Sequence, residues 1–118
     1  MAKKKADSDD IIEPLGDIDK IIHEPARLMI MSVLYVVESA DFVFLRNQTG
    51  LTNGNLSSHL NKLESVGYVE VEKKFKGKKP QTILKLSVQG REAFEVYRKK
   101  MEEYRKKMDQ ALTELSEK

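Results

Sequence analysis

The sequence predicts a mainly α-helical domain with a small β-hairpin, an α+β fold that ends in a long helix. Three observations predict this class. Residues 51–69 carry one apolar helical stripe, which is followed by a glycine stop. Two short alternating segments come next, joined by a lysine-rich tip, and the C-terminal stretch repeats its apolar side chains at heptad spacing.

The composition limits the classes of protein to which the chain can belong. Its 118 residues suit one domain, and 40% hydrophobic residues allow only a modest core. There is no cysteine, which excludes disulfides and thiolate metal sites. No apolar run approaches the roughly 20 residues that cross a bilayer. We therefore expect a cytoplasmic protein without membrane contact, whose polar residues 1–10 form a disordered tail.

The first half of the chain is predicted to be helical. We expect a short helix over 18–22 and a longer one over 25–39, with Pro25 in the first turn, where its missing N–H is tolerated. Asp41 is placed to cap a third helix over Phe42–Thr49. Together with the following elements, these helices form one predicted domain over 11–90.

The fourth predicted helix, over 52–66, has two contrasting faces. Thr52 is its expected cap, and Leu56, Leu60 and Leu63 form one apolar stripe. Gly67 suits the stop because it takes a positive φ at little cost. The opposite face carries residue types that contact base edges and phosphates: Asn53, Gly54, Asn55, Ser57, Ser58, Asn61 and Lys62. The alternative interpretation is an ordinary solvated surface.

A basic β-hairpin is predicted next. Residues 68–72 and 82–86 alternate like half-buried strands, and Gly77 and Pro80 are expected in the turn. Residues 51–90 hold seven lysines against three glutamates. Five lysines crowd the hairpin tip: Lys73, Lys74, Lys76, Lys78 and Lys79. Lysines at a tip can serve solubility alone, but five without an intervening acid favour a polyanionic partner.

Two helices joined by a tight turn and followed by a hairpin make a winged helix-turn-helix. In such a domain the helix over 52–66 is the recognition helix and residues 73–81 are the wing. His59, beside the apolar stripe, is interpreted as a structural histidine rather than a metal ligand. Arg27 could bind a phosphate or pair with Glu24.

The final segment, 91–118, is predicted to be a helix that forms a dimer. Ser87 is its expected cap, and the intervening positions are mostly charged. Its apolar residues follow the 3,4 spacing of a heptad seam: Phe94, Tyr97, Met101, Tyr104, Met108, Ala111 and Leu115. The later part extends too far for a small domain to cover, so we expect a second copy of the chain to bury it.

The sequence resembles winged-helix transcriptional regulators of the arsenical-repressor-like and multiple-antibiotic-resistance-repressor-like superfamily. The resemblance rests on residues 23–30, 51–60 and 63–69, including the pattern Ser-x-His-Leu-x-x-Leu-x-x-x-Gly-Tyr-Val over 57–69. It implies a homodimer whose recognition helices enter adjacent major grooves. The metal-sensing members use cysteines in a sensor helix, and this chain has none.

These observations predict a sequence-specific regulator of transcription that binds double-stranded DNA and acts as a repressor. The rivals are a non-sequence-specific architectural DNA-binding protein and a winged-helix module that binds proteins. No catalytic motif, metal site or cofactor site is indicated, so we do not expect an enzyme. Met101, Tyr104 and Met108 could line a pocket for a small-molecule effector, although a dimer seam explains them more simply.

Overall fold

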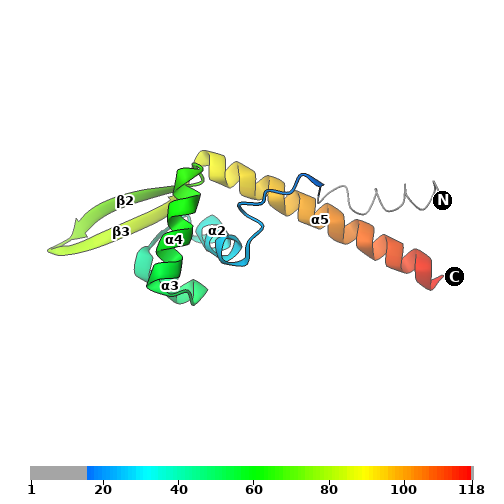
Figure 1. Ribbon diagram of the computed structural model, residues 1–118, viewed down its shortest axis with the longest axis horizontal. Coiled ribbons are helices and arrows are strands. Elements are labelled where there is room, and N and C mark those ends of the chain that lie inside the picture. Colours follow the sequence, from blue (N-terminus) through cyan, green and yellow to red (C-terminus); the bar gives the residue numbers. More distant parts are fainter. Residues whose placement is uncertain (1–15, 118) are drawn as a thin grey trace. The chain divides into compact units, whose positions relative to one another are not determined.

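The computed structural model describes residues 16–117 (Figure 1). The chain divides into two compact units. One is Lys20–Phe94, and the other joins Met1–Asp19 with Glu95–Lys118, of which residues 16–19 and 95–117 are described. The expected disordered tail over 1–10 lies outside the described residues.

The order of the elements confirms the predicted fold class, with helices, a small antiparallel sheet and a long final helix. The elements are α2 (Pro25–Val37), β1 (Ser39–Asp41), α3 (Phe42–Thr49), α4 (Asn53–Ser65), β2 (Val69–Lys76), β3 (Lys79–Leu86) and α5 (Val88–Ser116).

The expected helix over 18–22 is wrong. Residues 20–22 form turns, and the carbonyl groups at the end of this segment accept hydrogen bonds from the residues that follow it. The Glu24 N–H donates to the Ile22 carbonyl at 2.7 Å, and Arg27 Nε donates to the Ile21 carbonyl at 2.6 Å. The apolar side chain of Ile22 is nevertheless fully buried, so the segment still supplies the core.

Helix α2 begins as its sequence predicts, with Pro25 in the first turn. The cap is the carboxylate of Glu24, which accepts hydrogen bonds from the N–H groups of Ala26 and Arg27 at 2.8 and 3.2 Å. The helix ends at Val37, two residues before the predicted end, because Glu38 takes a positive φ of 68°. This turn starts strand β1.

Strand β1 was missing from the sequence prediction. It joins a three-stranded sheet in the order β1-β3-β2, in which β3 pairs antiparallel with both neighbours. Only Ser39, Ala40 and Asp41 pair, opposite Lys85, Leu84 and Ile83. Three residues are too few to show a period of two, so the strand leaves no signal of its own.

The β2–β3 hairpin is longer than predicted. Its strands reach Lys76 and Lys79, and the turn is made by Gly77, at φ 65°, and Lys78. The prediction that Pro80 lies in the turn is wrong, because Pro80 lies in β3 opposite Phe75. A strand tolerates proline there because β1 pairs only with residues 83–85, so β3 has a single neighbour at Pro80.

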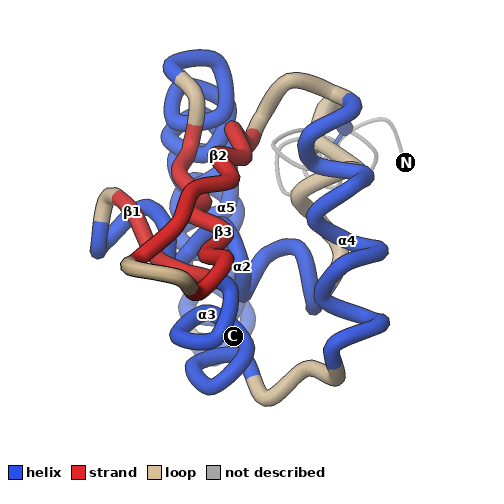
Figure 2. The backbone as a smooth tube through the Cα atoms, turned by 90° about the vertical axis from the view of Figure 1, so that its left-hand side faces the viewer, coloured by secondary structure: helices blue, strands red, loops and turns tan. Residues whose placement is uncertain are grey.

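The core of the Lys20–Phe94 unit lies where α2, α3 and α4 meet one face of the sheet. In Figure 2, α4 runs beside the hairpin, while β1 lies on the other side of it. Fully buried side chains from all these layers fill the interior: Ile22, Ile30, Met31, Leu34, Leu45, Leu56, Leu63 and Leu84. This core fixes α4 with respect to the hairpin.

The start of α5 is tied to the same unit. The Ser87 hydroxyl accepts from the Gly90 N–H at 2.9 Å and donates to the Gly67 carbonyl at 2.5 Å, which confirms Ser87 as a cap. A Cβ at position 90 would lie 2.0 Å from the Tyr68 carbonyl oxygen, so only glycine fits. The rings of Phe94 and Tyr35 pack with their centroids 5.1 Å apart.

Candidate nucleic-acid interface

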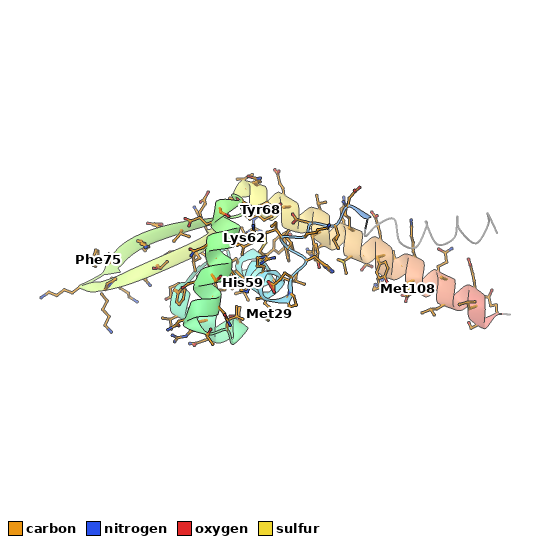
Figure 3. All side chains as sticks on the ribbon, in the orientation of Figure 1. Met29, His59, Lys62, Tyr68, Phe75 and Met108 are labelled. Carbon is orange, nitrogen blue, oxygen red and sulfur yellow. The ribbon has the colours of Figure 1, made fainter. Side chains whose placement is uncertain are left out.

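The two faces of α4 are those that the sequence predicts. Leu56, Leu60 and Leu63 point into the core, and the opposite side of the helix is uncovered. All seven predicted residues are exposed on this side, which we call the reading face: Asn53, Gly54, Asn55, Ser57, Ser58, Asn61 and Lys62. Figure 3 shows Lys62 at this helix. The core thus holds the helix, while its polar groups remain available to a ligand.

The N-terminus of α4 is built for close approach. The Thr52 hydroxyl caps it by accepting from the Asn55 N–H at 3.1 Å. A Cβ added at Gly54 would meet no other part of the described chain, residues 16–117, within 4 Å beyond its own helix backbone and its chain neighbours. The first N–H groups of a helix favour an anion such as a phosphate, and glycine lets the ligand come near the backbone.

Arg46, near the end of α3, is a site residue that sequence reasoning missed. Its Nη1 donates to the Asn53 Oδ1 atom at 2.9 Å. This bond orients the first side chain of the reading face and brings a guanidinium to the start of α4. The signal in the sequence was a lone basic residue in the last turn of α3, next to the turn at Gly50.

Arg27, His59 and Glu24 form a polar cluster that joins α4 to the start of α2. Arg27 Nη1 lies 3.3 Å from His59 Nδ1 and 3.5 Å from Glu24 Oε2, and His59 Nδ1 lies 3.4 Å from the same carboxylate oxygen. These contacts confirm His59 as a structural histidine. They also settle that Arg27 pairs with Glu24 within the chain.

The Glu24 carboxylate is stabilised in its charged form. Burial is the largest single influence and by itself would raise its pKa, but hydrogen bonds from the N–H groups of Ala26 and Arg27 oppose it. The charges of His59 and Arg27 act in the same direction, so the pKa of Glu24 lies below its usual value. The Glu24 carboxylate therefore stays charged beside Arg27 and His59 on the inner side of α4.

The wing carries uncompensated positive charge. Its five lysines, at positions 73, 74, 76, 78 and 79, are all exposed. Within residues 16–117, none of them forms an ion pair with a carboxylate. Glu70, at the base of the hairpin, pairs instead with Lys85 at 3.4 Å. Charges this close repel one another, so a polyanion that binds the wing relieves the repulsion.

The wing also exposes an aromatic side chain that sequence reasoning missed. Phe75 is 72% exposed near the end of the hairpin (Figure 3). In the sequence it resembles a strand residue that faces the core. The hairpin, however, extends beyond the part of the sheet that the helices cover, and this length could not be read from the sequence pattern.

The predicted heptad seam lies on α5, and its residues differ in exposure. Phe94 is 5% exposed and packs on Tyr35, so it serves the core of its own unit. Tyr97 is buried, and Met101, Tyr104 and Ala111 are half-buried. Met108 is 37% and Leu115 66% exposed. Apolar surface thus remains on the last turns of the helix.

No three His, Asp or Glu side chains within residues 16–117 lie close enough to hold a metal ion. Among the described helices, none combines the length and the apolar character that a membrane span requires.

A comparison with known protein families identifies the kind of domain that carries this surface. Residues 26–105 match the model of the winged helix DNA-binding domain. The chain belongs to the winged helix DNA-binding domain family. Membership confirms the predicted fold and the DNA-binding class, and it agrees with the expectation that the chain is not an enzyme, since the members of this family are not enzymes.

Relatives extend the match over most of the chain. Protein MJ0432 of Methanocaldococcus jannaschii is 40% identical over 78 residues, which are 66% of this chain and 85% of that protein. A transcriptional regulator homologue from Pyrococcus horikoshii OT3 is 27% identical, with a TM-score of 0.63 over 91% of this chain and 97% of its own. Overoxidized AbfR bound to DNA has a similar fold: it is 18% identical, with a TM-score of 0.58 over 99% and 89% of the two chains.

Proposed function

We propose that this winged helix protein is a transcriptional regulator that binds double-stranded DNA sequence-specifically as a homodimer. The observation that carries the proposal is the uncovered reading face of α4 beside the unpaired lysines of the wing, both held by one core. The similarity to a transcriptional regulator homologue from Pyrococcus horikoshii supports it.

In this proposal, α4 enters the major groove. The groove admits an α-helix, and asparagine can bind both hydrogen-bonding groups of an adenine edge. Asn55 and Asn61 are the residues that we assign to base edges, together with Ser57 and Ser58. Asn53, oriented by Arg46, and the open backbone at Gly54 are assigned to the start of the site, where phosphate approaches the helix N-terminus.

The wing lysines, together with Lys62, hold the DNA backbone, and the wing reaches the adjacent minor groove. Each lysine that neutralises a phosphate releases counterions, so binding weakens steeply as salt is added. These lysine–phosphate contacts supply affinity without reading sequence.

The dimer is proposed to form through α5, whose exposed Met108 and Leu115 continue the heptad seam. A two-fold dimer reads an inverted repeat, with half-sites whose centres are separated by about 10 base pairs or a multiple of this spacing. A protein seated on such a site blocks access to a promoter, so repression is the proposed mode of action.

Selection of bound duplexes from a random pool tests this function. We expect an inverted repeat to emerge, and we expect the protein to bind it about 1,000-fold or more tightly than a scrambled duplex. A ratio near one would instead support a non-sequence-specific architectural protein. No binding to any duplex at low salt would support a module that binds proteins, and would contradict the proposal.

A further inference from the structure

Phe75 is the only large apolar side chain of the β2–β3 hairpin that is exposed. Side chains alternate along a strand, so Val69, Val71, Lys73 and Phe75 of β2 share one face. Val69 is buried, Val71 is half-buried and Phe75 is 72% exposed. The face that packs on the domain at the base of the hairpin is therefore uncovered at its tip.

The residue opposite Phe75 extends this apolar tip. Phe75 pairs with Pro80 across the hairpin, and Pro80 is also exposed. Beyond this pair come only Lys76, Lys79 and the two turn residues. The tip therefore presents an aromatic ring and a proline ring, with Lys74 and Lys76 on either side of Phe75 and Lys79 before Pro80.

Folding gives no reason for a phenylalanine at this position. Its ring is mostly in water, and an exposed aromatic side chain on a hairpin favours aggregation. The surrounding lysines point to a partner rather than to a fold requirement. A negatively charged partner is drawn to the tip, and it must also offer apolar surface to the ring. Duplex DNA can do both, because phosphates border its grooves and a partly unstacked base step exposes the flat faces of its bases.

We propose that Phe75 is a wedge that enters the minor groove and partly unstacks one base step, so that the DNA bends away from the wing. This inference rests on the proposed function. The minor groove is about 6 Å wide, which admits the edge of a ring carried on a hairpin tip. Lysines on both sides anchor the phosphate walls of the groove.

The proposed wedge makes the wing a determinant of specificity. Pyrimidine–purine steps such as TA unstack more readily than others, so the cost of the wedge depends on the step that it meets. Apolar side chains act in this way in proteins that kink DNA from the minor groove. The wing thereby prefers flexible steps outside the half-site that α4 reads, without hydrogen bonds to their bases.

The test uses short duplexes selected by the full-length protein, labelled at both ends for energy transfer and carrying 2-aminopurine at the step beneath the wing. We expect the protein to shorten the end-to-end distance and to raise the 2-aminopurine fluorescence. The Phe75→Ala variant should lose both signals and weaken binding about tenfold. Replacing a TA step by AA should weaken the wild type and leave Phe75→Ala unaffected.

Two further variants separate a wedge from charge and from misfolding. Phe75→Lys adds charge to the tip, so a wing that only binds phosphates would bind more tightly, whereas a wedge would be lost. Val36→Ala changes an exposed apolar residue of α2 and should leave every signal unchanged. Because Phe75 is exposed, the melting temperature of Phe75→Ala should match that of the wild type.

The outcomes distinguish the wedge from the proposed function. If Phe75→Ala binds specifically, and bends the DNA and raises the fluorescence as the wild type does, the wedge is overturned and the proposed regulatory function is unaffected. Absence of duplex binding by the wild type would overturn both. Loss of self-association, rather than of DNA bending, in Phe75→Ala would assign the ring to a contact between copies of the chain and overturn the wedge.

Discussion

Gly54 shows how a single residue can serve a ligand rather than the fold. Its position in the first turn of α4 is surrounded by open space, and its φ is not in the left-handed region. Neither a turn nor a close contact within the chain therefore requires glycine. Gly90 is the opposite case, since the Tyr68 carbonyl oxygen leaves no room there for a Cβ.

This contrast gives a prediction for Gly54→Ala. Alanine should stabilise the protein by up to about 1 kcal/mol, because it favours a helix more than glycine does. The same methyl group should weaken DNA binding, because it separates the helix backbone from the phosphate. Thermal unfolding and fluorescence anisotropy with a selected duplex measure the two effects. A variant that is both more stable and unaffected in binding would remove Gly54 from the interface.

The Glu24 cluster gives a prediction about pH. The pKa of Glu24 is lowered in the folded chain, so the carboxylate stabilises the fold at pH values above its unfolded pKa. This stabilisation is lost as the pH falls through the lowered, folded pKa. The Glu24→Gln variant should be less stable than the wild type by about 1 kcal/mol at pH 7, the scale of a lost helix cap.

Urea unfolding at several pH values measures this difference. We expect the gap between the wild type and Glu24→Gln to close in acid, as Glu24 takes up its proton. Glu64→Gln is the matched control, because Glu64 is exposed on α4 and makes no ion pair among residues 16–117. A gap that persists unchanged below the folded pKa would show that the charge of Glu24 contributes nothing.

At the scale of elements, the wing lysines are assigned to affinity and the polar groups of α4 to base edges. Its strands are joined by a two-residue turn, and the lysines lie beyond the part that packs on the helices. The wing can therefore change charge without disturbing the core. Helix α4 likewise keeps its polar groups apart from the core, because they lie on the side of the helix opposite the buried leucine stripe.

Neutralising Lys76, Lys78 and Lys79 together to glutamine should flatten the salt dependence of DNA binding. Each lost phosphate contact reduces the slope of log K against log salt by about 0.9, so the triple variant should lose two to three units. Neutralising Lys99, Lys106 and Lys107 of α5 changes the net charge equally and should leave the slope nearly unchanged. Equal effects of the two triple variants would reject the wing as a phosphate clamp.

Strong local signals predicted α3, α4 and the hairpin from the sequence alone. Capping residues at Asp41 and Thr52, and glycines at the helix ends, mark boundaries through short-range hydrogen bonds. Strand β1 was not predicted because it forms through tertiary pairing with β3, and three residues are too few to show an alternation of apolar and polar side chains. The turn at 20–22 was not predicted because the apolar spacing of this segment is typical of a helix, whereas the chain bends there, with the Glu24 N–H bonded to the Ile22 carbonyl.

The candidate site was predictable to the same extent. The polar face of α4 follows from helical spacing, so all seven of its residues could be named in advance. Arg46 could not, because its bond to Asn53 depends on how α3 and α4 cross. The exposure of Phe75 could not be predicted either, because alternation along β2 assigns it to the inner face without showing where the covering helices end.

At the scale of the whole molecule, the chain joins a DNA-binding unit to a charged helix with an apolar seam. Helix α5 is 29 residues long, and its surface ion pairs, such as those of Arg105 with Glu102 and Asp109, lie among the exposed positions. Such pairs contribute little to stability in water. The exposed apolar residues on the later turns are therefore the part of α5 that a binding partner would be expected to bury.

The dimer makes a prediction for sedimentation. The wild type should be a dimer at micromolar concentration, and the double variant Met108→Glu and Leu115→Glu should be a monomer, because like charges would meet across the seam. Glu102→Ala, which removes an exposed residue of the same helix, should leave the dimer intact. A wild type that sediments as a monomer would contradict the dimer.

The reading face of α4 is proposed to recognise a DNA sequence. The most direct test of this recognition is the affinity for a selected duplex relative to a scrambled one, for the wild type and for the Asn55→Ala, Asn61→Ala double variant. We predict that the ratio falls about tenfold or more, while the affinity for the scrambled duplex is unchanged. An unchanged ratio in a folded variant would contradict the claim.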